Sequence, residues 1–259
     1  MESLTSENTY RSPKKKTFFA WRMMPGLGFY SKMISITLKS SRLAKRGTYD
    51  GEQWVHSSMG MLRALESVGA RFEVENIDII RCLGAPCVFV GNHMSTLETF
   101  VLPCIIQPVC PVTFIVKQSL VEYPVFKHVM ISRDPIVVNR TNPREDLKAV
   151  LEGGKERLNN GISIIVFPQT TRRVHRTIEK FNTIGVKLAK YASVPIVPFA
   201  LRTDAWENGK RIKDFGKIDP TRPIHICFGE PIRVKGNGKE EHEIIVRFIS
   251  EKLKEWFLE

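Results

Sequence analysis

The first 70 residues of the chain carry apolar side chains at helical spacing. Residues 17–45 are predicted to be helical, with an interruption near Pro25-Gly26-Leu27-Gly28, and residues 51–67 are predicted to form a second helix with its apolar side chains on one side. Residues 1–16 are polar and basic, and we expect them to form a flexible tail. The pattern therefore predicts a two-helix N-terminal unit over residues 17–70.

From residue 71 onward, short apolar runs alternate with segments of helical periodicity. Residues 71–80 alternate between apolar and polar side chains, as a half-buried strand does. Further apolar runs predict strands over residues 87–90, 112–116, 136–138, 162–167, 194–201 and 224–228. Helical spacing predicts helices over residues 142–160, 180–191 and 241–257, the first of them capped by Asn142. Residues 71–259 are therefore predicted to form an α/β domain in which helices flank a sheet.

Basic residues are concentrated in the N-terminal part of the chain. The whole sequence has a formal net charge of +12, and residues 1–48 contribute +8 of it through ten basic and two acidic residues. Such an excess favours an anionic partner, which would be a nucleic acid, an acidic membrane or a phosphorylated substrate. Because aromatic and aliphatic residues separate the basic ones, we predict contact with an anionic membrane surface and no binding of nucleic acid. An ordinary basic helix packed on the body of the protein is the alternative.

Three features bear on the compartment and on membrane spanning. The first sixteen residues are not followed by an apolar run long enough for a cleaved signal peptide. The best candidate for a membrane span, Thr99 to Val116, contains Pro103, Pro108 and Pro111, so we predict a short buried helix, a Pro-rich loop and a strand instead. The five cysteines favour a reducing compartment, match no zinc-binding pattern and are expected to be buried and inert.

The segment from Gly91 to Glu98 directly follows a predicted apolar strand, where sheets of this kind usually expose their working loops. A histidine such as His93 can take a proton from a hydroxyl, and a carboxylate that binds its other ring nitrogen fixes its tautomer. Glu98 can reach back to His93 if a helix begins near Ser95. The same residues also match a capping box, S-x-x-E, in which Glu98 would bind the backbone of the cap residue. The sequence leaves both interpretations open.

A second polar segment, Phe167 to Arg172, also lies at the end of a predicted strand. Its polar side chains are those of Gln169, Thr170, Thr171 and Arg172. Hydroxyl, amide and guanidinium groups in such a loop can bind phosphate, although a solvated turn could have the same composition. The sequence contains no G-x-S-x-G segment, which argues against a serine hydrolase.

Four segments resemble, in family order, the motifs of the glycerolipid acyltransferase superfamily, whose type member is lysophosphatidic acid (1-acylglycerol-3-phosphate) acyltransferase. The family's N-H-x-x-x-x-D motif corresponds to Asn92-His93, with Glu98 in place of the aspartate. Its strand that ends in arginine corresponds to residues 136–140, its F-P-E-G-T-R motif to residues 167–172, and its V-P-I-V-P motif to residues 194–198. Because four motifs occur in order, the chain is identified as a member, with the resemblance covering about two thirds of it.

The resemblance implies direct acyl transfer without a metal or a cofactor. The donor would be acyl-CoA or acyl-acyl-carrier protein and the acceptor a lysophospholipid, with 1-acylglycerol-3-phosphate as the first expectation. His93 would be the general base, and Glu98 would orient it. Lys117 lies in a segment that resembles the family's K-x-x-L, and with Arg140 and Arg172 it would hold the acceptor phosphate. The substrate site would also include Gln169, Thr170 and Thr171.

The same resemblance implies a fold and a location. The expected fold is a mixed, mostly parallel sheet flanked by helices, as in glycerol-3-phosphate acyltransferase. Residues 17–67 look like the two-helix motif that embeds bacterial members of the family in one leaflet. The chain is therefore expected at the cytoplasmic face of the membrane, as a peripheral or monotopic protein.

Three residues depart from the family pattern. Glu98 is one methylene longer than the usual aspartate, a difference that related lipid A acyltransferases share. Gln169 and Thr170 replace the glutamate and glycine of the third motif, and this leaves the identity of the acceptor open. The alternatives are an acyltransferase for another lysolipid and a membrane-binding pseudoenzyme of the same fold.

Overall fold

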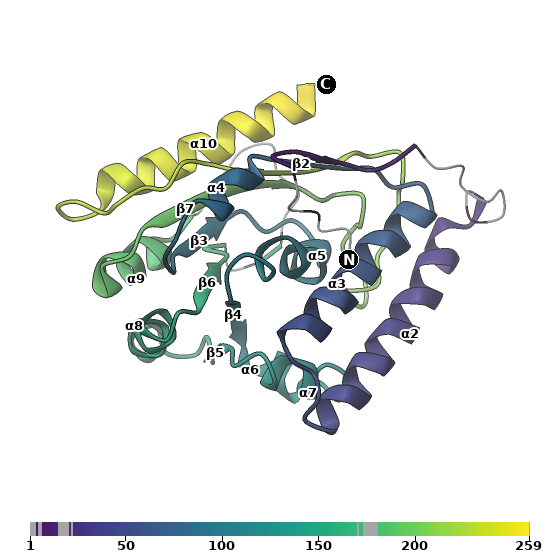
Figure 1. Ribbon diagram of the computed structural model, residues 1–259, viewed down its shortest axis with the longest axis horizontal. Coiled ribbons are helices and arrows are strands. Elements are labelled where there is room, and N and C mark those ends of the chain that lie inside the picture. Colours follow the sequence, from purple (N-terminus) through teal and green to yellow (C-terminus); the bar gives the residue numbers. More distant parts are fainter. Residues whose placement is uncertain are drawn as a thin grey trace.

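A single mixed sheet organises the computed structural model, which describes Leu4, Trp21 and residues 7–14, 23–169, 171–172 and 181–258. Within these residues eight strands pair in the order β1-β2-β8-β7-β3-β6-β4-β5 (Figure 1). The β1–β2 and β7–β8 pairs are antiparallel and the other neighbours are parallel, so the predicted α/β fold with a mostly parallel sheet is confirmed. The strands are β1 (Tyr10–Arg11), β2 (Phe72–Glu75), β3 (Val88–Gly91), β4 (Val112–Lys117), β5 (Ile136–Val138), β6 (Ser163–Val166), β7 (Ile196–Arg202) and β8 (Ile224–Phe228).

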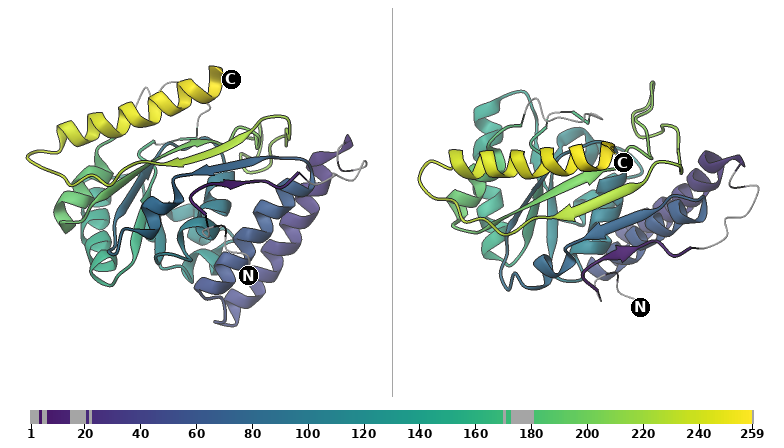
Figure 2. Two further views of the ribbon diagram at one scale, coloured as in Figure 1. Left: turned by 45° about the horizontal axis from the view of Figure 1, so that its top comes forward. Right: turned by 90° about the horizontal axis from the view of Figure 1, so that it is seen from above.

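Helices cover both faces of the sheet (Figures 1 and 2). One apolar cluster joins the sheet to α2, α3 and α5, and a second joins its other face to α8, α9 and α10. The helices are α2 (Pro25–Lys45), α3 (Gly51–Ser67), α4 (Ile77–Arg81), α5 (Leu97–Ile106), α6 (Gln118–Glu122), α7 (Lys127–Ile131), α8 (Pro143–Asn159), α9 (Ile184–Ala192) and α10 (Lys239–Leu258). Asn142 caps α8 as predicted, and its side chain accepts hydrogen bonds from the first turn.

Strand β3 lies inside the sheet between β7 and β6, to both of which it is parallel, and it is buried along its whole length. Phe89 belongs to the cluster under α2, α3 and α5, while Val88 and Val90 belong to the opposite cluster. A strand covered on both faces needs a continuous apolar sequence, and residues 88–90 supply it. Because β6 and β7 flank β3 in parallel, the carboxyl ends of all three strands meet at one edge of the sheet.

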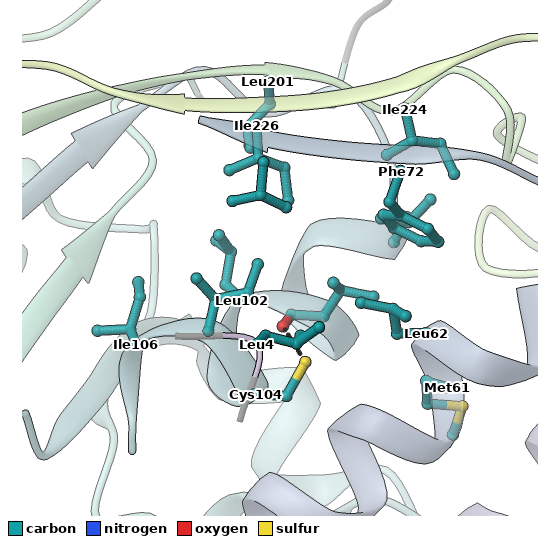
Figure 3. Packing of buried hydrophobic residues seen from close by; sticks show 14 of the residues in the cluster. Leu4, Met61, Leu62, Phe72, Leu102, Cys104, Ile106, Leu201, Ile224 and Ile226 are labelled. Carbon is teal, nitrogen blue, oxygen red and sulfur yellow. Dashed lines mark hydrogen bonds between the residues drawn. The ribbon is translucent and has the colours of Figure 1, made fainter. Parts of the chain in front are cut away.

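The cluster between the N-terminal helices and the sheet forms much of the core. Figure 3 shows side chains of α3 and α5 facing side chains of the strands across this layer. Those labelled on the helices are Met61, Leu62, Leu102, Cys104 and Ile106, and those on the strands are Phe72, Leu201, Ile224 and Ile226. Burying a large aliphatic or aromatic side chain stabilises a fold by roughly 1.5–3 kcal/mol. The two-helix unit is therefore part of the domain's core as well as part of its surface.

The interruption predicted near Pro25 is present. Trp21 and Met23 are helical, Met24 is not (φ −130°, ψ 63°), and α2 begins at Pro25 and continues to Lys45. Proline suits the first position of a helix because the N–H there has no partner within the helix. A Cβ on Gly28 would lie 2.7 Å from Cε3 of Trp21 and 2.9 Å from Cγ1 of Val68, so glycine permits close packing here. Residues 17–20 and Arg22, which the prediction also includes, lie outside the described residues.

The strand predicted over residues 71–80 is shorter than expected. β2 ends at Glu75, and Asn76 adopts a φ of +61°. This left-handed conformation is one that asparagine tolerates better than most residues, and it turns the chain into α4. Ile77 lies in this short helix and is fully buried, so its apolar character reflects burial and not a continued strand. Local alternation cannot distinguish these two cases.

Residues near the N-terminus pair with the sheet. Within residues 1–16, for which we predict a flexible tail, Tyr10–Arg11 forms β1 and pairs with β2. The hydroxyl of Tyr10 donates to Oε1 of Glu66 in α3 at 2.7 Å, and the hydroxyl of Ser12 donates to the same atom at 2.5 Å. The chain before α2 is thus attached both to the sheet and to α3.

The proline-interrupted apolar stretch folds as predicted. Thr99 to Val116 divides into most of α5, a turn and most of β4, with Pro103 inside α5. None of the helices in the described part of the chain is both long enough and apolar enough to cross a membrane.

Three of the five cysteines are buried. Cys87, Cys104 and Cys227 are buried as predicted, and burial raises the pKa of the Cys104 thiol to about 12. Cys110 is half-buried. Cys82 is exposed at the end of α4, so the prediction of burial is wrong for this residue.

Candidate active site

The loop that carries His93 begins where β3 ends, and two residues fix its start. A Cβ on Gly91 would lie 2.2 Å from Cε2 of Phe199 on the neighbouring strand, so only glycine fits without a shift of that ring. The buried amide of Asn92 binds β7 twice: Nδ2 donates to the carbonyl of Leu201 and Oδ1 accepts from its N–H, both at 2.8 Å. His93 therefore leaves the sheet from a rigid position.

Glu98 lies at the first turn of α5 and is completely buried. Its Oε1 lies 3.0 Å from Nδ1 of His93 and accepts from the N–H groups of Met94 at 2.6 Å and Ser95 at 3.0 Å. Its Oε2 accepts from the hydroxyls of Ser95 at 3.0 Å and Thr203 at 2.9 Å. One carboxylate thus organises the whole turn between β3 and α5.

The structure contains both arrangements that the sequence left open. Glu98 binds the backbone N–H of Ser95, which is the reverse bond of a capping box, and it binds Nδ1 of His93 as well. A carboxylate has about four lone-pair sites, so the two roles do not compete. The capping interaction holds the carboxylate in the orientation that the histidine contact needs.

The buried carboxylate of Glu98 is stabilised in its charged form. Burial acts to raise its pKa, but the hydrogen bond and charge of His93 and the N–H of Ser95 act in the opposite direction, and the net result is a lowered pKa. Since the carboxylate is ionised at neutral pH, it accepts a hydrogen bond from Nδ1 of His93. In the neutral imidazole this tautomer leaves Nε2 as the nitrogen that can accept a proton.

The ring of His93 lies on an aromatic surface. It stacks on Phe167 with 4.3 Å between ring centroids and 15° between planes, and 18% of its side chain is exposed. Phe167 follows β6, so the third motif supports the first. The histidine is therefore held by a carboxylate at one nitrogen and by a ring face, while part of it remains accessible.

The third-motif segment binds the backbone of the first motif. Oε1 of Gln169 accepts a hydrogen bond of 2.5 Å from the N–H of His93. Gln169 is thus in direct contact with the histidine loop, and its role in substrate binding stays a prediction. Thr171 is exposed beside it, and Thr170 lies outside the described residues.

Arg172 lies beside the start of α5. Its guanidinium donates to the hydroxyl of Thr96 and forms an ion pair with Asp214, with 2.7 Å between Nη1 and Oδ1. The Thr96 hydroxyl in turn donates to the same carboxylate oxygen at 2.9 Å. Thr96 is three residues from His93, so the cation of the third motif lies next to the histidine loop.

Lys117 and Arg140 lie further along the same edge of the sheet. Lys117 ends β4, and Arg140 follows β5 with a φ of +62° and its N–H bound to Asp146. These strands are two and three positions from β3, which corresponds to about 10 and 14 Å. The structure brings Gln169 and Arg172 to the His93 loop and leaves Lys117 and Arg140 at the side of it.

The segment after β7 contributes contacts that the sequence analysis missed. Thr203 donates to Glu98, Nδ2 of Asn208 donates to the carbonyl of Met94 at 2.7 Å, and Asp214 binds Arg172. Thr203 directly follows β7, close to the end of the strand predicted over residues 194–201, and this position is a signal that could have identified it. Asn208 and Asp214 have no comparable signal, because they come to the site through a long excursion of the chain.

The described residues offer no metal centre. No group of three or more histidine, cysteine, aspartate or glutamate side chains among them is arranged to hold a metal ion. The chemistry available in the described loops is a histidine–carboxylate pair, a neighbouring guanidinium, and several hydroxyls and amides.

The geometry agrees with the comparisons to known proteins. The family model described as Acyltransferase matches residues 71–202. A 1-acyl-sn-glycerol-3-phosphate acyltransferase of Pseudomonas aeruginosa is 31% identical over 187 residues, 72% of this chain and 68% of that protein. A probable enzyme of the same name from Mycoplasma pneumoniae is 32% identical over 55% of each chain. The chain therefore belongs to the acyltransferase family, and the expected membership is confirmed.

A solved structure shows the same fold. The 1-acyl-sn-glycerophosphate (LPA) acyltransferase PlsC from Thermotoga maritima superposes with a TM-score of 0.67, covering 90% of this chain and 95% of that one. The sequences are 18% identical, so this likeness concerns the fold. The mixed sheet with flanking helices is thus the architecture of an acyltransferase.

Proposed function

We propose that this chain transfers a fatty acyl group from an acyl thioester to the free hydroxyl of 1-acylglycerol-3-phosphate, which yields phosphatidic acid. The observation that carries the proposal is the contact between Nδ1 of His93 and the buried, ionised carboxylate of Glu98. The relatives from Pseudomonas aeruginosa and Mycoplasma pneumoniae are named for this acceptor, which supports the choice.

The proposed reaction needs only the side chains of the His93 loop. Nε2 of His93 removes the proton of the acceptor hydroxyl while its oxygen attacks the thioester carbonyl. The tetrahedral intermediate then collapses, the carbon–sulfur bond breaks, and the imidazolium returns the proton to the departing thiolate. Glu98 stabilises the imidazolium and holds the ring orientation throughout. General base catalysis of this kind contributes typically about 10²–10⁴ in rate.

The acceptor phosphate is proposed to bind beside the start of α5. Arg172 contacts Thr96, which comes three residues after His93 in the loop. It therefore supplies a charge-assisted hydrogen-bond donor close to the reacting histidine. Lys117 and Arg140 extend the basic edge at greater distance and are proposed to act on the rest of the headgroup or on the donor's phosphates. Thr170 and Thr171 remain part of the proposed substrate site. The donor is proposed to be acyl-CoA or acyl-acyl-carrier protein.

The N-terminal unit is proposed to dock on the anionic cytoplasmic face of the membrane. Leu27, Ile34 and Leu38 share one face of α2 and are 59%, 48% and 43% exposed. The last turn of the same helix carries Arg42 and Lys45. An exposed apolar stripe with flanking cations suits a bilayer interface, where the apolar groups enter and the cations meet headgroups.

The decisive experiment is a transfer assay with the purified chain in detergent. Labelled acyl-CoA and acyl-carrier protein are offered with a panel of lysolipids, and wild type is compared with His93→Ala. His242→Ala is the matched control, because His242 lies on α10, across the sheet from α5. We expect transfer to 1-acylglycerol-3-phosphate that falls at least about 10²-fold in His93→Ala and persists in the control. Transfer to another lysolipid alone would replace the proposed acceptor, and no transfer to any acceptor would favour a pseudoenzyme.

A further inference from the structure

The chain between β7 and β8 makes a long projection whose tip is basic and apolar. We call residues 210–217, Lys-Arg-Ile-Lys-Asp-Phe-Gly-Lys, the basic tip. Its four cations are exposed, and Ile212 and Phe215 are 55% and 44% exposed. Figure 2 shows the projection standing away from the sheet in the view from above. Large apolar side chains beside clustered cations are not typical of a purely solvated loop.

The backbone of this projection is held by internal hydrogen bonds. The N–H of Glu207 donates to the carbonyl of Lys217 at 2.9 Å, and the N–H of Gly209 donates to that of Lys213 at 3.1 Å. A Cβ on Gly216 would lie 1.7 Å from the carbonyl oxygen of Glu207, so glycine allows the two sides to approach. The basic tip is therefore presented in a defined conformation.

The basic tip lies directly beside the exposed stripe of α2. Phe215 stacks on Tyr30 with ring centroids 5.3 Å apart, and the hydroxyl of Tyr30 donates to the carbonyl of Gly216 at 2.5 Å. On the surface of a helix, residues three and four apart are neighbours, so Tyr30 lies between Leu27 and Ile34. The exposed apolar stripe therefore continues from α2 onto Phe215.

The charge of the basic tip is directed towards solvent. Asp214 is the only acid in the sequence of the tip, and it pairs with Arg172 at the candidate active site. The exposed end of the tip carries Lys210, Arg211 and Lys213, with Ile212 between the last two. A net positive group that surrounds an exposed apolar side chain is complementary to an anionic lipid surface.

We propose that the basic tip is a second bilayer contact beside α2, in which Lys210, Arg211 and Lys213 meet anionic lipid headgroups while Ile212 and Phe215 enter the interface. The proposal rests on the docking of α2 described above and extends it to a segment about 180 residues away in the sequence. The same projection binds the active-site loop through Asn208 and Asp214. Docking of the tip would therefore set the headgroup layer next to Arg172.

Vesicle flotation tests the proposal without any need for activity. Vesicles of phosphatidylcholine with 30% phosphatidylglycerol, about the anionic content that makes a surface strongly negative, are compared with pure phosphatidylcholine. The test variant is Lys210→Gln with Lys213→Gln, and Ile212→Ser tests the apolar part. The matched control is Lys187→Gln with Lys190→Gln, two exposed lysines on α9, which lies on the far side of the molecule from α2 (Figures 1 and 2). A further variant, Leu27→Ser with Ile34→Ser, tests α2 itself.

We expect the loop double variant to bind anionic vesicles about thirtyfold more weakly at low salt, while the α9 control stays within about twofold of wild type. Ile212→Ser should weaken binding in high salt as well, because its contribution is not electrostatic. If both loop variants bind like wild type while the α2 variant does not, the tip makes no bilayer contact and the proposal fails alone. If the α2 variant also binds like wild type, the docking of the N-terminal unit fails with it.

Discussion

Asp214 and Arg172 form an ion pair of 2.7 Å, and both also contact the hydroxyl of Thr96. The pair joins two segments that follow different strands of the sheet, and it lies at the start of the helix that carries Glu98. A guanidinium fixed in this way is pre-organised for an incoming phosphate, since less side-chain freedom is lost on binding.

The ion pair leads to a prediction about substrate affinity. Arg172→Ala should raise KM for a phosphate-bearing acceptor by about 10–100-fold, because a charge-assisted hydrogen bond to the phosphate is lost. Asp214→Asn should raise KM by about 3–10-fold with kcat little changed, because Asp214 positions the guanidinium and does not touch the reacting atoms. Steady-state kinetics with varied acceptor measure both. A fall in KM for Asp214→Asn would show instead that the carboxylate competes with the substrate phosphate.

Removal of the charge of Glu98 should reduce turnover. Glu98→Gln keeps the size and some hydrogen bonds of the side chain but no longer stabilises the imidazolium. We expect kcat to fall by about 10²–10⁴ with a smaller change in KM. Glu145→Gln, an exposed acid in the first turn of α8, is the control for a glutamate in a similar helical position. Unchanged kcat in Glu98→Gln would mean that the capping role alone explains the residue.

The same residue predicts a pH dependence of stability. The pKa of Glu98 is lower in the folded chain than in the unfolded chain, so the unfolded state binds the proton more tightly. Its stabilising contribution is therefore present above the unfolded pKa and is lost as the pH falls through the folded pKa. Urea unfolding of wild type and Glu98→Gln between pH 7 and about pH 2.5 should show a free-energy difference that is constant above about pH 5 and narrows below the ordinary pKa of glutamate. A difference that stays constant over this whole pH range would contradict the lowered pKa.

Gln169 should act as a positioning residue through the N–H of His93. Gln169→Ala leaves that donor without its acceptor, and we expect kcat to fall about tenfold. Gln169→Glu restores both an acceptor and the residue found in the related third motif, and activity should stay within about threefold of wild type. Measurement of kcat for the two variants decides the matter. Equal losses in both would show that the amide group itself, with its donor, is required.

Gly91 is predicted to be intolerant of a side chain. Gly91→Ala would place a Cβ 2.2 Å from the ring of Phe199 and should destabilise the fold by about 1–3 kcal/mol. Phe199→Leu in the same chain should recover part of this loss, because the smaller side chain removes the contact. Chemical denaturation of the two single variants and the double variant forms a double-mutant cycle. Additive effects would show that the ring does not limit the substitution.

The residues next to strand ends were the ones that the sequence could identify. His93 and Gln169 each follow a strongly apolar run, and parallel strands bring such ends together, so their proximity was predictable from the fold class. Thr203 stood at the end of another run but belonged to no recognised motif. Asn208 and Asp214 depend on contacts with residues more than 100 positions earlier, which no local pattern specifies.

Other differences came from local ambiguity. Apolar residues at positions 77 and 79 suit both a strand and a short buried helix, and only the left-handed backbone of Asn76 separates the two. Likewise, the spacing of Ser95 and Glu98 fits a cap and a histidine partner equally well, and the structure shows that one carboxylate serves both.

The pairing of β1 with β2 also has a mechanical consequence. The chain enters the α2–α3 pair from a strand at the edge of the sheet and leaves it into the adjacent strand, so the pair is anchored at both ends. A helix pair with a single connection could rotate relative to the rest of the domain, whereas this pair is fixed to the sheet that carries the His93 loop. The distance between His93 and the exposed stripe of α2 is therefore fixed by the fold. With α2 docked as proposed, the acceptor hydroxyl would have to extend from the lipid surface by that distance, so the anchoring would select substrates by how far their headgroups extend.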